Sequence, residues 1–139
     1  MAAPLDIAEA VGKLQDHSTS NACSISQKAA IAALKDSGDF SRNMLQEFQK
    51  RRNFCISRLK EFKKISFVVP QGAFYIFFNI SKTGLASSVF AKRLLDETFV
   101  CLIPGEGFGA DDYARISFAT SMPALEKGMD RLGEWLEKL

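Results

Sequence analysis

The chain has 139 residues, of which 18 are Lys or Arg and 16 are Asp or Glu, so its formal net charge is +2. This balance excludes binding to nucleic acid or to a membrane surface that is driven mainly by charge. A hydrophobic fraction of 47% and 12 phenylalanines exclude a mainly disordered chain. No apolar run approaches the roughly 20 residues that cross a bilayer, and the N-terminus has no signal-peptide pattern. We therefore expect a cytoplasmic protein with no nucleic-acid or membrane partner.

The first part of the sequence predicts helices. Apolar residues recur at helical spacing over residues 5–15, which predicts a short helix that ends near Gly12 or soon after. The polar residues 17–21 favour a loop, because such side chains bond to nearby backbone N–H groups. The alanine-rich run that follows predicts a helix to about residue 34, and Gly38 is well placed to stop it.

A long, basic helix is expected to begin after Asp39 or Ser41, because apolar residues then keep a helical spacing over about six turns. From residue 65 the sequence becomes β-branched and aromatic. Strands are predicted over residues 65–69, 73–80, 99–103 and 113–119, and helices over residues 87–97 and 123–139. The residues of these two helices that are expected to face the core are Val89, Phe90, Leu94, Leu95, Leu125, Met129, Leu132, Leu136 and Leu139. This order predicts an α+β or α/β two-layer fold, in which helices cover a small sheet.

The three cysteines, Cys23, Cys55 and Cys101, are odd in number and widely spaced. They match neither a disulfide framework nor a zinc site, which indicates a reducing compartment, and we expect each to be a small core hydrophobe. His17 is the only histidine. The sequence therefore offers no metal-binding histidine pair, and neither a metal centre nor a Ser/His/Asp triad is predicted.

Arg115 is the most informative residue. It lies in the middle of a predicted strand whose period of two places Ile116 and Phe118 on one face and Arg115, Ser117 and Ala119 on the other. The two small neighbours are expected to leave an open slot in front of the arginine. A guanidinium among apolar residues is costly unless it meets an anion, and its planar fork suits a carboxylate. The alternative is an ion pair with an acid of the chain: Asp111, Asp112 or another local acid.

A glycine-rich segment, residues 105–109, precedes Arg115 by a few residues, so the segment and the arginine are expected to border the opening of the same site. Its spacing matches no phosphate-binding motif, and a tight turn at the end of a strand is the simpler interpretation. Lys82 follows a predicted strand in a polar turn that is expected to be exposed, so we do not expect it to be a nucleophile.

Taken together, several segments resemble a known family. Residues 70–75, 104–109 and 114–119, in that order, look like the C-terminal part of class I and II pyridoxal-phosphate aminotransferases of fold type I. Residues 15–21 and 26–30 resemble the loop and helix that close the large domain in bacterial aspartate aminotransferases. The resemblance covers the chain from about residue 5 to residue 139.

The resemblance implies a homodimeric enzyme that holds pyridoxal 5'-phosphate on a lysine and converts an amino acid to a 2-oxo acid, with aspartate and 2-oxoglutarate as the expected pair. It implies that residues 1–38 end the large domain and that residues 39–139 form the small domain, with a mixed or antiparallel sheet. Arg115 matches the arginine that clamps the substrate α-carboxylate. The residues implied to line the wall of the active site are Tyr75, Gly105, Phe108 and Gly109. Those implied to approach the partner subunit's active site are Ser18, Thr19, Ser20 and Asn21.

The sequence also departs from the family pattern. No segment matches the lysine that carries the cofactor or the cluster that binds its phosphate, and Lys82 is followed by Thr83-Gly84-Leu85 rather than by the family's continuation. We therefore expect this chain to contain no catalytic residue and to be inactive alone. Two alternatives stay open: an aminotransferase of alanine or of an aromatic amino acid, and a non-catalytic carboxylate-binding module of the same fold.

Overall fold

The computed structural model describes residues 2–35 and 38–139. By their internal contacts the residues divide into two compact units, a first unit that ends at Arg42 and a second unit that begins at Asn43. The elements are α1 (Leu5–Ser18), α2 (Ser24–Lys35), α3 (Gly38–Glu61), β1 (Ser66–Phe67), β2 (Tyr75–Asn79), η1 (Ser81–Thr83), α4 (Ser87–Thr98), β3 (Ile103–Pro104), η2 (Gly105–Phe108), β4 (Tyr113–Ser117) and α5 (Met122–Lys138).

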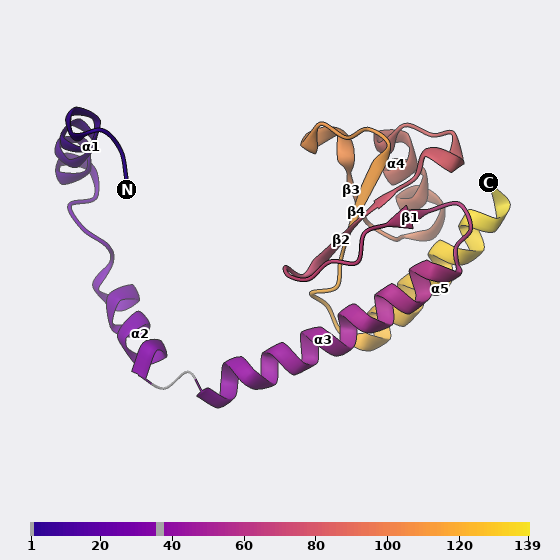
Figure 1. Cartoon of the computed structure of the whole chain (residues 1–139), viewed down its shortest axis with the longest axis horizontal. Helices are drawn as coiled ribbons and strands as arrows, with labels where there is room; N and C mark the ends of the chain where they lie inside the picture. Colours follow the sequence, from indigo (N-terminus) through magenta and orange to yellow (C-terminus); the bar gives the residue numbers. More distant parts are fainter. Residues whose placement is uncertain (1, 36–37) are drawn as a thin grey trace. The chain divides into compact units, whose positions relative to one another are not determined.

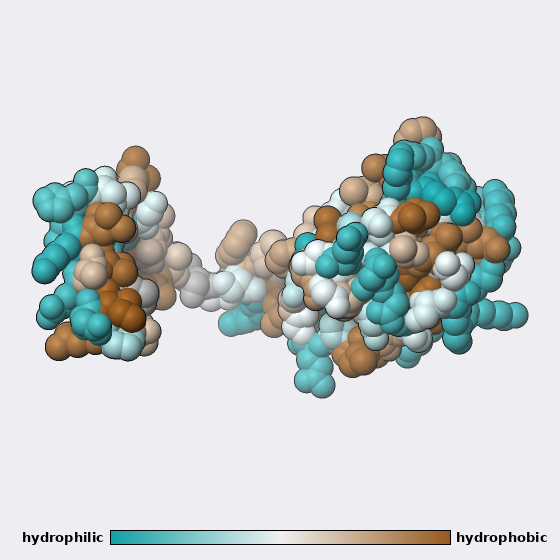
Figure 2. Space-filling model, turned by 90° about the horizontal axis from the view of Figure 1, so that it is seen from above, coloured by the Kyte–Doolittle hydropathy of each residue, from teal (hydrophilic) through white to brown (hydrophobic). Residues whose placement is uncertain are grey.

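The first unit contains α1 and α2, and neither helix buries a side chain. Hydrophobic side chains lie among hydrophilic ones on its surface (Figure 2), and Leu14 and Leu34 are among those exposed. The helix α1 runs to Ser18, past Gly12, because a glycine weakens a helix by only about 1 kcal/mol and does not break its hydrogen-bond ladder. Gly38 is the first residue of α3, and the predicted stop of α2 before it falls on residues 36–37, which lie outside the described residues.

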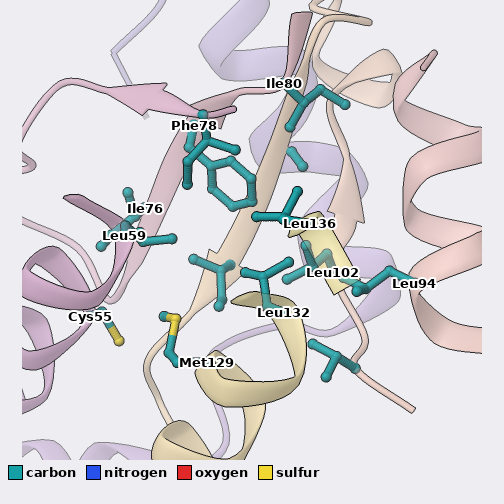
Figure 3. Close-up of a cluster of buried hydrophobic side chains, with 14 of the residues drawn as sticks. Cys55, Leu59, Ile76, Phe78, Ile80, Leu94, Leu102, Met129, Leu132 and Leu136 are labelled. Carbon is teal, nitrogen blue, oxygen red and sulfur yellow. The ribbon is translucent and has the colours of Figure 1, made fainter. Parts of the chain in front are cut away.

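The second unit is built on a four-stranded antiparallel sheet with the order β1-β2-β4-β3. One face of this sheet is buried, and on it lie Ile76 and Phe78 of β2 with Ala114 and Ile116 of β4. In the core these side chains join residues of three helices, α3, α4 and α5, as Figure 3 shows for part of the cluster. Helices therefore cover one face of the sheet, and the predicted α+β two-layer fold is confirmed.

The long helices of the second unit close the bottom of this core. The helices α3 and α5 lie side by side (Figure 1), and Arg58 of α3 pairs with Asp130 of α5 at 2.7 Å. The predicted inner stripe of α5 is confirmed for Leu125, Met129, Leu132 and Leu136, which are buried. Leu139, the last predicted member, follows the end of the helix and is only partly buried against the core. The buried Trp135 completes that stripe.

Two sequence-based expectations for the second unit are wrong in detail, namely the buried side of α4 and the extent of the strands. Val89 and Leu95 of α4 are 46% and 43% exposed, because the buried stripe of this helix is set by Phe90 and Leu94, one turn apart. The strands are shorter than predicted, since β1 keeps two residues and β3 begins only at Ile103. Before β3, Phe99 takes a left-handed conformation that ends α4, so the apolar run after it starts as irregular chain.

The cysteines differ in exposure. Cys55 is buried in the core, as predicted, whereas Cys23 and Cys101 are exposed, which corrects the expectation that all three are core residues. Burial raises the pKa of the Cys55 thiol to about 11. Hydrogen bonds from the backbone of Ser26 and then of Ile25 lower the pKa of the Cys23 thiol.

These environments predict a clear order of thiol alkylation. At pH 7.5, iodoacetamide is expected to modify Cys23 and Cys101 in the folded chain and Cys55 only in denaturant, because the reactive species is the accessible thiolate. Below pH 7.5, Cys23 should keep the larger share of its reactivity. Peptide mass mapping at several pH values measures this, and labelling of Cys55 at the rate of Cys101 in the native chain would contradict it.

A pH-dependent contact joins α4 to α5. Glu97 accepts hydrogen bonds from Arg93 at 2.9 Å and from the indole of Trp135 at 2.6 Å, and these lower the pKa of its carboxyl below the ordinary 4.5. A carboxyl with a lowered folded-state pKa contributes stability above its unfolded pKa and loses it as pH falls through the folded pKa.

We therefore expect Glu97→Gln to destabilise the chain at pH 7, and the gap from wild type to close as pH falls through 4.5 and below. Urea denaturation at pH 3 to 7 measures the gap. The control is Asp96→Asn, whose partner Lys92 is exposed and which should have a smaller effect throughout. A gap that grows on acidification would contradict the assignment.

Within residues 2–35 and 38–139, no helix combines the length and the apolar character needed to span a membrane. Over the same residues, no three His, Cys, Asp or Glu side chains gather as metal ligands would.

Candidate functional site

The second unit leaves one face of its sheet without covering helices. We call this the open face, and it is formed by the residues that alternate with the buried ones, namely Tyr75, Phe77, Asn79, Ile103, Tyr113, Arg115 and Ser117. The prediction that Ile116 and Phe118 point to the core while Arg115 points away from it is confirmed. The open face is mainly aromatic and apolar, and Arg115 is its one charged residue.

Arg115 lies at the centre of the open face. On β4 it is paired with Phe77 of β2 on one side and with Ile103 of β3 on the other. Its guanidinium carbon lies 5.0 Å from the ring centre of Tyr75 and 4.7 Å from that of Phe108. Two aromatic rings thus lie beside the guanidinium, and the predicted open slot in front of it stays a prediction.

The alternative role of Arg115, an ion pair with a nearby acid, is not what the structure shows. Asp111 accepts hydrogen bonds from the backbone and the hydroxyl of Ser87, and Asp112 accepts one from the side-chain amide of Asn79. Among the residues that the structure describes, no carboxylate lies within ion-pair distance of Arg115. Its N–H groups are thus left for an acceptor from outside the described chain.

Further aromatic side chains of the open face pack against one another near Arg115. Phe77 and Tyr113 stack on each other with ring centres 4.8 Å apart and an angle of 18°. Phe108 meets Phe77 edge-on at 5.9 Å. A groove of about 540 Å³ is lined by β1, by the chain between β1 and β2, and by Tyr75, Phe77 and Tyr113 of the open face. A flat or apolar group in this groove would meet aromatic surface.

The segment η2 carries Phe108 and is a tight turn, the simpler of the two interpretations of its sequence. The two residues that follow it donate their backbone N–H groups back into the turn, Gly109 to Glu106 and Ala110 to Gly105. Gly105 is buried, and a Cβ there would overlap the carbonyl oxygen of Ala110 and lie 2.5 Å from that of Tyr113. Gly109 ends the turn in a left-handed conformation with φ 74°.

A buried hydroxyl anchors this turn to the rest of the fold. Ser87, at the start of α4, is fully buried and donates to Asp111 at 2.8 Å. The same oxygen accepts the backbone N–H of Glu106 at 3.0 Å. Ser87 thus joins α4, η2 and the chain before β4, and the position of Phe108 next to Arg115 follows from these bonds. Neither Ser87 nor Asp111 was among the predicted site residues.

The structure brings Tyr75 and Phe108 to Arg115, while Gly105 and Gly109 shape the turn. That these four residues line the wall of an active site stays a prediction. Phe77 and Tyr113 were missed, although their alternation with core residues of the same strands was a signal. Lys82 is exposed in η1.

The segment from Ser18 to Asn21 lies in the first unit and is exposed. Its path is set by Ser20, which has φ 58° and donates from its hydroxyl to the carbonyl of Asp16 at 3.2 Å. The predicted approach of Ser18, Thr19, Ser20 and Asn21 to a partner subunit stays a prediction.

Known proteins resemble this chain in sequence. Residues 1–132 match the family model described as aminotransferase class I and II. The chain is 40% identical to the aspartate aminotransferase of Geobacillus stearothermophilus over 98% of its own length and 36% of the relative's, and 39% identical to that of Thermotoga maritima over 94% and 33%. The chain therefore spans about a third of the length of the curated relatives it matches.

The structure is similar as well. A crystal structure of the aspartate aminotransferase from Thermotoga maritima matches with a TM-score of 0.82 and 40% identity, over 95% of this chain and 33% of that one. The aromatic aminotransferase from Pyrococcus horikoshii matches with a TM-score of 0.87 and 38% identity, over 99% and 38%. Fold, sequence and the order of motifs agree with the resemblance noted from the sequence, and the chain belongs to the class I and II aminotransferase family.

Proposed function

We propose that this chain is the carboxylate-binding part of an aspartate aminotransferase, in which Arg115 binds the α-carboxylate of the amino acid and of the 2-oxo acid. The observation that carries the proposal is the Arg115 guanidinium on the open face, held beside two rings and without an acid partner in the described chain. Curated relatives at 38–40% identity are named aspartate aminotransferases, which supports aspartate and 2-oxoglutarate as the substrate pair.

The proposed role follows from the chemistry of the two groups. An amino acid and its 2-oxo acid share only the carboxylate beside the reacting carbon, so one fixed cation serves both halves of a transamination. A guanidinium donates two parallel N–H bonds to a carboxylate, which fixes the direction of the substrate as well as its position. Arg115 thereby orients the reacting carbon and takes no proton itself.

Pyridoxal 5'-phosphate is the cofactor of this family and supplies the electron sink of transamination when it is bound. The residues around Arg115 do not fit that group, since the open face has neither a lysine for the Schiff base nor cationic donors for a phosphate besides Arg115 itself. We therefore propose that the cofactor is held outside this chain, that no catalytic residue lies within it, and that the chain is inactive alone.

The same proposal assigns each part of the chain to a domain of the larger enzyme. Residues 1–38 would end the large domain and residues 39–139 would form the small domain of a cytoplasmic homodimer, with Ser18, Thr19, Ser20 and Asn21 near the partner's site. The bare helices of the first unit support this, because α1 and α2 expose apolar side chains such as Leu5 and Ile25 that a larger body would cover.

A second candidate is the transamination of an aromatic amino acid. The aromatic groove beside Tyr75, Phe77 and Tyr113 favours it, as does the likeness to the Pyrococcus horikoshii aromatic aminotransferase. A third candidate is a non-catalytic module in which Arg115 only binds a carboxylate. Measured turnover of an amino acid would distinguish both enzymes from this module.

A chimera tests the proposal. Residues 1–139 replace the matching part of the Geobacillus stearothermophilus aspartate aminotransferase, and oxaloacetate formation from aspartate and 2-oxoglutarate is measured. We expect turnover by the chimera and none by the 139-residue chain with added cofactor. Phenylalanine and alanine as donors rank the alternatives. A dimeric, cofactor-loaded chimera without turnover of any donor would contradict the proposal, as would turnover by the chain alone.

A further inference from the structure

We propose that Tyr75 and Phe108 are positioning residues for Arg115, which hold its guanidinium over the open face and leave its N–H groups free for a carboxylate. The inference rests on the proposed role of Arg115 in binding substrate. It adds a device that makes that role possible without an acidic partner.

The two rings that contact the guanidinium come from two different elements of the second unit. In the sheet, β4 lies between β2 and β3. Tyr75 belongs to β2, and Phe108 belongs to η2, which directly follows β3. Their ring centres lie 5.0 Å and 4.7 Å from the guanidinium carbon, within the range in which a cation is attracted to an aromatic ring.

Aromatic rings and carboxylates position an arginine in different ways. A neighbouring carboxylate would fix the side chain by accepting its N–H bonds, and it would then compete with a substrate carboxylate for the same donors. A ring attracts the cation through its π-electrons and accepts none of those bonds. Two rings therefore restrict the rotamers of a long side chain while the donors stay available, which is the requirement of a preorganised anion site.

The rings themselves are held by the fold. Tyr75 is paired with Ser117 on β4 and meets the ring of Phe74 edge-on at 5.9 Å. Phe108 meets Phe77 edge-on, and its turn is anchored by the bond from the Glu106 N–H to the Ser87 hydroxyl. Both rings are partly exposed, Tyr75 by 37% and Phe108 by 53%, so their replacement leaves the core intact.

The test uses the 139-residue chain with ¹⁵N-labelled arginine. The variants are Tyr75→Leu, Phe108→Leu, the double variant, and Tyr75→Phe, which keeps the ring. The control is Phe99→Leu, which removes an exposed ring at the end of α4. Two quantities are measured by NMR: the order parameter of the Arg115 Nε–H, with its ring-current shift, and the affinity for succinate.

We expect each leucine variant to lower the order parameter, to reduce the ring-current shift and to weaken succinate binding about threefold, with about tenfold loss in the double variant. Tyr75→Phe and Phe99→Leu should match wild type. An unchanged order parameter and affinity in the double variant would overturn the inference. Were Phe108→Leu to disturb the turn, the comparison of Tyr75→Leu with Tyr75→Phe decides alone.

The outcome also separates the two proposals. Loosening of Arg115 in the leucine variants, together with no response of Arg115 to succinate in wild type, would remove the substrate role and keep the positioning role. Succinate binding at Arg115 that is indifferent to both rings would keep the substrate role and remove the positioning role.

Discussion

Replacing Arg115 by lysine in the chimera is expected to lower kcat/KM for aspartate by about two orders of magnitude or more. Lysine keeps the positive charge but loses the planar fork, so it cannot donate two parallel N–H bonds to the α-carboxylate. The loss should be of the same order for every amino-acid donor that the chimera accepts, since all share that carboxylate. Steady-state kinetics measure it, and cofactor absorbance and dimer mass verify that the variant is assembled.

The chain offers a matched control for this change. Arg51 also lies over an aromatic ring, that of Phe48 at 5.5 Å, but on α3, where it pairs with Glu47. We expect Arg51→Lys to change kcat/KM by less than about twofold, because lysine keeps the positive charge beside Glu47 and α3 is not part of the open face. An Arg115→Lys chimera as active as Arg51→Lys would refute the role of Arg115.

Replacing Gly105 by alanine is expected to destabilise the chain by about 3 kcal/mol or more. The added Cβ would overlap the carbonyl oxygen of Ala110 and lie 2.5 Å from that of Tyr113, and backbone atoms cannot move aside as the end of a side chain can. Urea denaturation measures the free energy of unfolding. The control is Gly107→Ala in the same turn, where nothing lies within 4 Å of the new Cβ and the effect should be within about 0.5 kcal/mol.

The Gly105 prediction also bears on the site. The turn that Gly105 packs into place carries Phe108, so a folded fraction of Gly105→Ala should show a weaker ring-current shift at Arg115 than Gly107→Ala does. Equal stability of the two alanine variants would mean that η2 does not pack against Ala110 and Tyr113 as described.

The face of the sheet on which the Arg115 side chain lies could be predicted from the sequence, because successive side chains of a strand point to opposite faces as a consequence of backbone geometry alone. The same holds for the inner stripe of α5, where Leu125, Met129 and Leu132 repeat at helical spacing. Local patterns of this kind fix which face of an element is buried, and so they fixed which face of the sheet carries the arginine.

Contacts between segments far apart in the chain could not be predicted in this way. The ring of Tyr75 reaches Arg115 across 40 positions of the sequence, through the pairing of β2 with β4. The bond from Glu106 to Ser87 depends on how α4 lies against η2. The predicted start of the strand at residue 99 was wrong for a related reason. The residues of that apolar run favour a strand by themselves, but the left-handed conformation of Phe99 interrupts the run, and β3 begins only at Ile103.

The most direct measurement is a crystal structure of the chimera with succinate bound. We expect one succinate carboxylate to accept two N–H bonds from Arg115, at about 2.7–2.9 Å, with the guanidinium still beside the rings of Tyr75 and Phe108. Succinate bound elsewhere, with Arg115 facing solvent or paired with Asp111 or Asp112, would contradict the account.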